Sequence, residues 1–147
     1  MIPAQNVKNA NYVILGLGRS GLSSAAALKA GGAKIWCLDD NMNNLKKAEG
    51  LGLNCTVPDK INWDKIDVLL VSPGVPHHYP QPHVIVAEAI KNGVAIDNDI
   101  GLFFKSIASA DWPKYEEIPK IVSVTGSNGK STTSALIHHI LQCENRP

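Results

Sequence analysis

Two glycine-containing segments of the sequence have the composition and spacing of phosphate-binding loops. The first is Gly-Leu-Gly-Arg-Ser-Gly over residues 16–21, and the second is Thr-Gly-Ser-Asn-Gly-Lys-Ser-Thr over residues 125–132. Glycine lets the backbone turn sharply and present its N–H groups to an anion. If a helix follows, its N-terminus adds further N–H groups and the positive end of the helix dipole. Both segments are therefore candidate phosphate sites.

The first loop has the pattern of a dinucleotide-binding turn. In that pattern the first glycine makes the tight turn, the second lets backbone approach a diphosphate, and the third allows close packing of helix and strand. Gly16, Gly18 and Gly21 take these positions, and Asp39 ends the next apolar run, where a carboxylate can accept a ribose hydroxyl. The pattern indicates a diphosphate-linked nucleotide without specifying NAD. The alternative is that the glycines only close a turn between strand and helix.

The second loop is a shortened form of the phosphate loop of ATPases, because it lacks the first glycine of the standard pattern. Gly126 and Gly129 still leave the backbone N–H groups free to face phosphate oxygens. Lys130 can neutralise the β- and γ-oxygens, and the hydroxyl of Ser131 or Thr132 can bind Mg²⁺. The alternative, a glycine turn with an N-capping serine, leaves the lysine and two hydroxyl residues unexplained. The loop therefore predicts ATP and Mg²⁺.

The elements that must position the first loop are short apolar runs that alternate with helical stretches. The sequence predicts strands at 12–15, 34–38, 67–71 and 94–96, and helices at 20–30, 43–51, 83–92 and 100–110. Continuous apolar runs are typical of strands buried on both faces of a parallel sheet. Strands alternating with helices predict βαβ units, so we expect an α/β fold with a Rossmann-like parallel sheet.

The pattern changes at residues 111–119, which contain two prolines and no apolar period and are typical of a linker. A strand at 120–124 and a helix from about Lys130 are predicted next. The helix carries an apolar stripe at helical spacing, made of Leu136, Ile137, Ile140 and Leu141. The predicted parts are a nucleotide-binding domain at 1–110, a linker at 111–119, and the first β-α unit of a P-loop ATPase domain at 120–147. One strand and one helix cannot bury their own faces, so we expect this second domain to be incomplete. This unit should therefore either be mobile or bury its stripe against the first domain or a second copy of the chain.

Composition limits the classes of partner. The chain has 147 residues, is 44% hydrophobic and carries a net charge of +1, so it has no excess charge for nucleic acid or anionic lipid. No apolar run approaches the roughly 20 residues of a membrane span, and residues 1–6 lack the pattern of a signal peptide. Three cysteines without C-x-x-C spacing indicate neither a disulfide framework nor a zinc ribbon. We expect a reduced, cytoplasmic protein with no nucleic-acid or membrane partner.

Other polar residues are interpreted as structural. His77, His78 and His83 lie in a proline-rich loop and lack a third ligand at metal-binding spacing, so we expect surface histidines. The acidic pairs at 39–40 and 97–99 end predicted strands, which indicates a binding rim rather than a glycosidase pair. The cysteines have no adjacent base and are expected to fill the core.

The order of the motifs resembles that of the Mur ligases. After the first glycine loop come Ser-Pro-Gly at 72–74, Asp-Ile-x-Leu-Phe at 99–103 and the Thr-Gly-Ser-Asn-Gly-Lys-Ser-Thr loop. That last loop is specific to Mur-type and folylpolyglutamate ligases, and the other motifs point within this group to the members that add D-glutamate. The resemblance runs from about Asn11 to about Gln142 and covers only the first portion of a longer, three-domain family.

The resemblance implies a ligase that uses ATP and Mg²⁺ to add D-glutamate to UDP-N-acetylmuramoyl-L-alanine in peptidoglycan precursor synthesis. Family members bind the UDP part of the substrate on the first domain and ATP on the central one. They phosphorylate the substrate carboxylate, and the D-glutamate amine attacks the acyl phosphate. The implied UDP-binding residues are Gly18, Arg19, Ser20, Asp39, Asp40, Asn41, Ser72, Pro73 and Gly74. The implied ATP-binding residues are Gly126, Ser127, Asn128, Gly129, Lys130, Ser131 and Thr132, with Lys130 as the catalytic charge partner and Ser131 as the magnesium ligand.

Two positions depart from the family. Residues 39–41 lack the arginine that commonly follows the second strand, so a charge contact to the nucleotide is either missing or comes from Arg19. Gly101 replaces a glutamate, which we expect to weaken the start of the helix at 100–110 and to remove any role of that carboxylate. The acids, histidine and modified lysine that the family uses for magnesium and catalysis are absent from the chain. We therefore expect the chain alone to be inactive as a ligase.

Two other functions remain open from the residues themselves. An NAD-dependent oxidoreductase domain can be built on the first loop and Asp39, but it predicts no second phosphate loop. A non-catalytic nucleotide-binding module is compatible with both loops.

Overall fold

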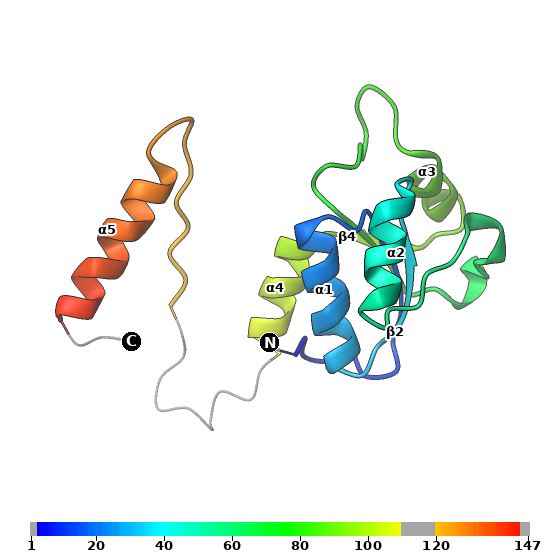
Figure 1. The fold of residues 1–147 in the computed structure, drawn as a ribbon, viewed down its shortest axis with the longest axis horizontal. Coiled ribbons are helices and arrows are strands. Elements are labelled where there is room, and N and C mark those ends of the chain that lie inside the picture. Colours follow the sequence, from blue (N-terminus) through cyan, green and yellow to red (C-terminus); the bar gives the residue numbers. More distant parts are fainter. Residues whose placement is uncertain (1–2, 110–119, 145–147) are drawn as a thin grey trace. The chain divides into compact units, whose positions relative to one another are not determined.

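The computed structural model describes residues 3–109 and 120–144. The chain divides into two compact units, Met1–Ala110 and Asp111–Pro147, which are described separately. The linker predicted at 111–119 lies outside the described residues. In the first unit, strands and helices alternate along the chain as the apolar pattern predicts (Figure 1).

The first unit contains a parallel sheet with the strand order β2-β1-β3-β4. The strands are β1 (Asn11–Leu15), β2 (Lys34–Leu38), β3 (Val68–Val71) and β4 (Ala95–Asp97). Leu15 pairs in register with Leu38 on one side and with Val71 on the other, so the three strands end at the same edge. The expected α/β class and parallel sheet are confirmed. The bounds of β2 are as predicted, and no end of the other strands differs from the prediction by more than one residue.

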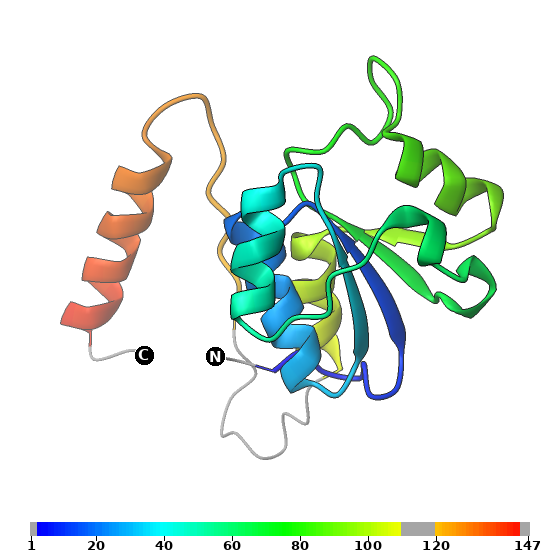
Figure 2. The ribbon, with the colours of Figure 1, turned by 45° about the vertical axis from the view of Figure 1, so that its right-hand side comes forward.

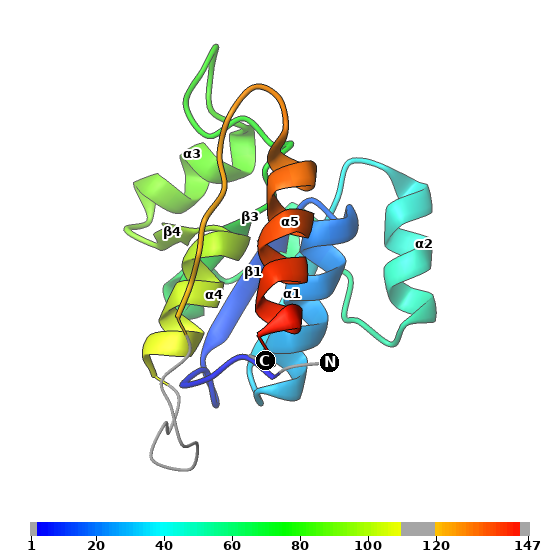
Figure 3. The same cartoon turned by 90° about the vertical axis from the view of Figure 1, so that its left-hand side faces the viewer.

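Helices cover both faces of this sheet (Figure 2). The helices α1 (Arg19–Ala30), α2 (Met42–Gly50) and α4 (Asp99–Ala108) lie on one face, with α1 beside α4 (Figure 3). The helix α3 (Val84–Lys91) and the short 3₁₀ turns η1 (Pro58–Lys60) and η2 (Trp63–Lys65) lie on the other.

The two cores follow from the alternation of side chains along each strand. Ile14 and Leu70 pack beneath α1, whereas Val13 and Leu69 point to the α3 face, and all four are 0% exposed. Burial of each such side chain stabilises the fold by about 1.5–3 kcal/mol. Because the central strands β1 and β3 are buried on both faces, their sequences are continuous apolar runs rather than alternating ones.

The outer edge of β2 is partly covered by a segment that sequence analysis did not predict. The Cys37 N–H donates to the Asn54 carbonyl at 2.8 Å, and the Thr56 N–H donates to the Cys37 carbonyl at 3.0 Å. The segment thus pairs with β2 for a single residue, at Cys55. An exposed strand edge is a template for unwanted pairing, and this contact shortens the open part.

The second unit is described over residues 120–144. It contains the helix α5 (Lys130–Cys143), which confirms the helix predicted from about Lys130. The strand predicted at 120–124 was wrong, because no strand is assigned there. A strand is defined by hydrogen bonds to a neighbour, and none of the described residues supplies one to this segment. Within the apolar stripe of α5, Leu136 and Ile140 are exposed.

None of the helices in the described ranges combines the length and the apolar character that a membrane crossing requires.

Candidate functional site

The first glycine loop lies where the strand order of the sheet reverses. From β1 the chain passes to β2 on one side, and then crosses to β3 on the other. In open parallel sheets, ligands bind outside the carboxyl ends of the strands at this point, because the loops after the two central strands diverge there. Residues 16–21 follow β1 and residues 72–75 follow β3. The predicted loop and the Ser-Pro-Gly segment are therefore brought together.

Two of the three loop glycines are required by packing. Gly16 has a φ of +89°, and a Cβ built on it would lie 2.9 Å from the Cβ of Ser72. A Cβ on Gly21 would collide with the carbonyl oxygen of Gly16. These two residues let the strand-to-helix turn close tightly, as the pattern predicts for the first and third glycines.

Gly18 is different from its two neighbours in the motif. Its φ is −67°, which any residue adopts, and it is the N-cap of α1 without a side-chain capping hydrogen bond. A Cβ built on Gly18 would meet nothing within 4 Å. The tight-turn alternative therefore accounts for Gly16 and Gly21 but gives no reason for a glycine at 18. Open space in front of an uncapped helix N-terminus is what an approaching anion needs.

Asp39 is held by the protein rather than open to a ligand. Its Oδ2 accepts hydrogen bonds from the Leu17 N–H at 2.6 Å and from the Asn44 amide at 3.0 Å, and its Oδ1 accepts one from the Asn41 N–H at 2.7 Å. The carboxylate therefore joins the glycine loop to the start of α2. The prediction that Asp39 accepts a ribose hydroxyl did not anticipate that most of its acceptor positions are already used.

Ser72 is likewise part of the scaffold of the loop. It is 7% exposed, and its hydroxyl donates to the Gly16 carbonyl at 2.7 Å. The resemblance implies that Ser72 binds UDP, and the structure shows that its hydroxyl fixes the β3 loop against the glycine loop. Pro73 and Gly74, which follow it, are exposed.

The other predicted UDP-binding residues lie on the surface around this loop. Arg19 is exposed and Ser20 is half-buried, both in the first turn of α1. Asn41 is the N-cap of α2 and its Oδ1 accepts from the Asn43 N–H at 2.9 Å. The Asp40 side chain is 87% exposed, and its Oδ2 lies 3.2 Å from Nε2 of His83.

His83 was expected to be a surface histidine, and this interpretation was wrong. Its side chain is only 18% exposed, and as the N-cap of α3 it accepts a hydrogen bond at Nδ1 from the Ile85 N–H at 3.2 Å. Sequence reasoning missed this role, although the position of His83 directly before an apolar helical stretch was a usable signal.

The helix that contains Gly101 starts at Asp99, despite the expected weakening. Asn98 caps α4, with its Oδ1 accepting from the Gly101 N–H at 2.8 Å. A Cβ on Gly101 would collide with Oδ1 of Asp97, whose Oδ2 accepts from the Lys105 ammonium at 2.9 Å. That hydrogen bond raises the pKa of Lys105. A glycine at 101 thus makes room for a carboxylate that pairs with the helix.

The second glycine loop precedes α5 in the second unit. Gly126 has a φ of +148° and Gly129 a φ of +77°, conformations that favour glycine. Gly129 is the N-cap of α5 and no side chain caps the helix, so the N-capping serine alternative has no support here. The Lys130 ammonium lies over the loop and donates to the Gly126 carbonyl at 2.5 Å. The remaining residues predicted to bind ATP, Ser127, Asn128, Ser131 and Thr132, are exposed.

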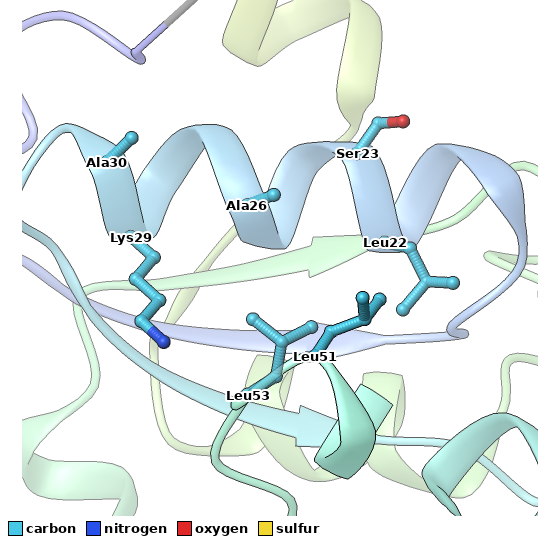
Figure 4. A pocket seen from close by; sticks show the side chains of 7 residues that line it. All are labelled: Leu22, Ser23, Ala26, Lys29, Ala30, Leu51 and Leu53. Atoms are coloured by element: carbon cyan, nitrogen blue, oxygen red, sulfur yellow. The ribbon is translucent and has the colours of Figure 1, made fainter. Parts of the chain in front are cut away.

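A separate hollow of about 640 Å³ opens between α1 and residues 51–53 (Figure 4). Leucine and alanine side chains form most of its lining, including Leu22, Leu51 and Leu53. Lys29 is the only cation in this lining, and its ammonium donates to the Gly52 carbonyl at 2.7 Å. A mostly apolar hollow whose lysine is already hydrogen-bonded to a carbonyl does not suit a nucleotide phosphate, so we place the candidate site at the glycine loop.

No protein-family model matches the chain. Among curated proteins, it is 51% identical over 148 residues to the UDP-N-acetylmuramoylalanine–D-glutamate ligase of Roseobacter denitrificans. It is 53% identical over 150 residues to the ligase of the same name from Ruegeria pomeroyi. Both matches cover 100% of this chain and 32% of the relative, so the chain spans about a third of the length of these relatives. The resemblance to the amino-terminal portion of a D-glutamate-adding Mur ligase is confirmed.

Two solved structures share the fold. Shikimate dehydrogenase from Aquifex aeolicus has a TM-score of 0.52 and 15% identity, covering 78% of this chain and 51% of that one. Shikimate 5-dehydrogenase from Thermus thermophilus has a TM-score of 0.50 and 18% identity, covering 81% of this chain and 52% of that one. At such low identity these matches support the Rossmann-like fold alone.

Proposed function

We propose that this chain, which resembles the amino-terminal portion of UDP-N-acetylmuramoylalanine–D-glutamate ligases over its whole length, provides the UDP-binding domain and the ATP phosphate loop of such an enzyme. The observation that carries the proposal is the 51% identity to a curated ligase over a span that includes both glycine loops. An oxidoreductase domain explains only the first loop, and the dehydrogenase structures with the same fold are too dissimilar in sequence to favour it.

In this proposal the diphosphate of the UDP substrate binds at the N-terminus of α1. The open space at Gly18 lets the diphosphate approach the backbone N–H groups, and Arg19 and Ser20 supply a charge and a hydroxyl. The exposed residues Asp40 and Gly74 flank the nucleoside, together with Asn41 and Pro73. Asp39 and Ser72 contribute indirectly, by holding the loop in position.

The second loop holds the phosphates of ATP. Backbone N–H groups of residues 126–132 face the phosphate oxygens, and the Lys130 ammonium moves from the Gly126 carbonyl to the β- and γ-oxygens. The Ser131 hydroxyl would be the protein ligand of magnesium, which would supply positive charge to the transferred phosphoryl group. In the described part of the chain, no group of three or more His, Cys, Asp or Glu residues could hold a metal by itself.

The proposed reaction adds D-glutamate to UDP-N-acetylmuramoyl-L-alanine in two steps. The substrate carboxylate takes the γ-phosphoryl group and releases ADP, and the D-glutamate amine then displaces phosphate from the acyl phosphate to form the amide. Both steps need the reacting groups held in line. Residues 120–144 supply one phosphate loop and one helix to this arrangement. We therefore expect the 147-residue chain to bind nucleotides but not to form product in a single-turnover assay.

Separate titrations of UDP and NAD into the ¹⁵N-labelled chain test the proposal. We expect UDP to shift the amide signals of residues 16–21 at lower concentration than NAD does. ATP with Mg²⁺ should shift those of residues 126–132 instead. Shifts at the first loop caused by NAD and none caused by UDP would contradict the proposal and favour the oxidoreductase alternative.

A further inference from the structure

His83 is fixed at the base of the loop that follows β3. Its backbone N–H donates to the Pro76 carbonyl at 3.0 Å, and its own carbonyl accepts the Ala87 N–H at 3.0 Å in the first turn of α3. Its Nδ1 accepts from the Ile85 N–H at 3.2 Å. The imidazole is therefore held by the start of α3 and not by the tip of the loop.

The hydrogen bond to α3 also indicates which ring nitrogen faces Asp40 as a donor. Because the Ile85 N–H can only donate, Nδ1 of His83 must carry a lone pair, and the proton of the neutral imidazole lies on Nε2. Nε2 is 3.2 Å from Oδ2 of Asp40, so the Nε2–H donates to that carboxylate. This hydrogen bond joins the imidazole to the Asp40 carboxylate.

This hydrogen bond crosses the nucleotide site. Asp40 follows β2 and His83 lies in the connection from β3 to α3, and these two strands flank β1 on opposite sides. A contact between their loops therefore passes over the carboxyl end of β1, where the glycine loop starts. The adjacent carboxylate of Asp39 is held by three donors, whereas among the described residues Asp40 has His83 as its hydrogen-bond partner.

We propose that His83 is a positioning residue of the nucleotide site that acts through Asp40. It holds the Asp40 carboxylate over the glycine loop, where its remaining lone pairs can accept a hydrogen bond from the uracil N3–H or a ribose hydroxyl. Without His83, a carboxylate that is 87% exposed would sample several rotamers, and binding would have to select one of them. This inference rests on the proposed function, because it takes UDP as the ligand.

His83→Asn separates the two roles of the histidine. Asparagine is a good N-cap and keeps the hydrogen bond to α3, but its side chain is too short to reach Asp40. We expect it to weaken UDP binding about threefold, the upper part of the range for an exposed polar pair. Asp40→Ala should weaken UDP binding about tenfold. The double variant should bind UDP like Asp40→Ala alone, because His83 has nothing left to position.

The matched control is His78→Asn, the same substitution at an exposed position in the same loop, which should bind UDP like the wild type. The affinities are measured by calorimetric titration of UDP. The nitrogen chemical shifts of His83 in the free protein should identify the Nε2–H tautomer.

Three results would overturn the inference alone while UDP still binds. They are wild-type affinity in His83→Asn, an equal threefold loss when His83→Asn is added to Asp40→Ala, and an Nδ1–H tautomer of His83. A wild-type chain that does not bind UDP would overturn the proposed function, and this inference with it.

Discussion

The two glycine loops of the chain both precede a helix, but the surroundings of their glycines differ. In the first unit the loop is crowded, since Gly16 and Gly21 have no room for a Cβ and the carbonyl of Gly16 is bound by the Ser72 hydroxyl. In the second unit a Cβ on Gly129 would meet nothing within 4 Å, and on Gly126 only the Asn128 carbonyl at 3.5 Å. There the glycines are required by their positive φ values rather than by neighbouring atoms.

The difference shows that some glycines of such a motif serve packing and others serve binding. In the first loop, two glycines serve the packing of strand, helix and β3 loop, and only Gly18 is left without a structural reason. In the second loop the backbone conformation and the lysine that lies over it belong to the binding surface itself. In the first unit, substitution of Gly16 or Gly21 should therefore lower stability, whereas substitution of Gly18 should mainly weaken binding.

The largest effect is expected from Gly21→Ala. The added Cβ would overlap the Gly16 carbonyl, which belongs to backbone and cannot move aside without opening the turn. We expect the free energy of unfolding of the first unit to fall by about 3 kcal/mol, typical of overpacking against rigid neighbours. Urea unfolding followed by the fluorescence of Trp36 and Trp63, in a Trp112→Phe background, measures the loss.

Gly18→Ala is the matched control for this stability measurement. Its Cβ would enter open space, so only the poorer N-cap is expected to count, at about 0.5–1 kcal/mol. Equal losses for the two variants would show that crowding does not distinguish the glycines of this loop.

The next largest effect is that a variant in either unit loses affinity for one nucleotide and keeps its affinity for the other. Lys130→Ala removes the cation over the second loop and should abolish measurable binding of ATP with Mg²⁺, while UDP affinity stays unchanged. Arg19→Ala should weaken UDP binding by about 1.5–3 kcal/mol, the size of a charge-assisted hydrogen bond, and leave ATP binding unchanged. Calorimetric titrations of both nucleotides into both variants give the four values. Loss of both nucleotides in either variant would contradict independent sites.

A smaller effect is expected from Gly18→Ala on UDP affinity. The methyl group lies where we propose that the diphosphate approaches the backbone, so binding should weaken about tenfold although the unit remains folded. Gly50→Ala is a suitable control, because a Cβ there also meets nothing within 4 Å and the residue, at the end of α2, is not among those proposed to bind UDP. An unchanged UDP affinity in Gly18→Ala would leave the tight turn as the explanation of the motif.

The sequence predicted the elements of the first unit better than the roles of its polar side chains. Apolar runs and their spacing were enough for the strands and helices, because burial on both faces leaves a direct record in composition. The roles of Asp39 and Ser72 depend on contacts with Leu17 and Gly16, which are far away in sequence and meet only when β1, β2 and β3 pair. The prediction of a strand at 120–124 was wrong for a related reason, because an apolar run does not specify the neighbouring strand with which it must pair.

The cysteines also differ between the two units, since those of the first unit are at least partly buried and the one in α5 is exposed. The expectation that all three fill a core was therefore only partly right. Cys37 is buried and Cys55 is half-buried, but Cys143 in α5 is exposed rather than part of a core. Burial, with a smaller contribution from Cys55, raises the pKa of Cys37 from 9.0 to about 12. A thiolate-directed reagent such as iodoacetamide at pH 8 should therefore modify Cys143 first and Cys37 only after the first unit unfolds.

The raised pKa of Cys37 also predicts the smallest effect, a loss of stability at alkaline pH that is absent at neutral pH. The folded state favours the protonated thiol of Cys37, so its contribution to stability is complete below the unfolded pKa of 9.0 and is lost as pH rises through about 12. Urea unfolding of the first unit should thus show a stability that falls between pH 9 and 12. Cys37→Ala should lower stability at pH 7 through the lost packing, yet it should make this alkaline decline shallower. An equally steep decline in Cys37→Ala would assign it to other groups, such as Tyr12, whose pKa burial also raises.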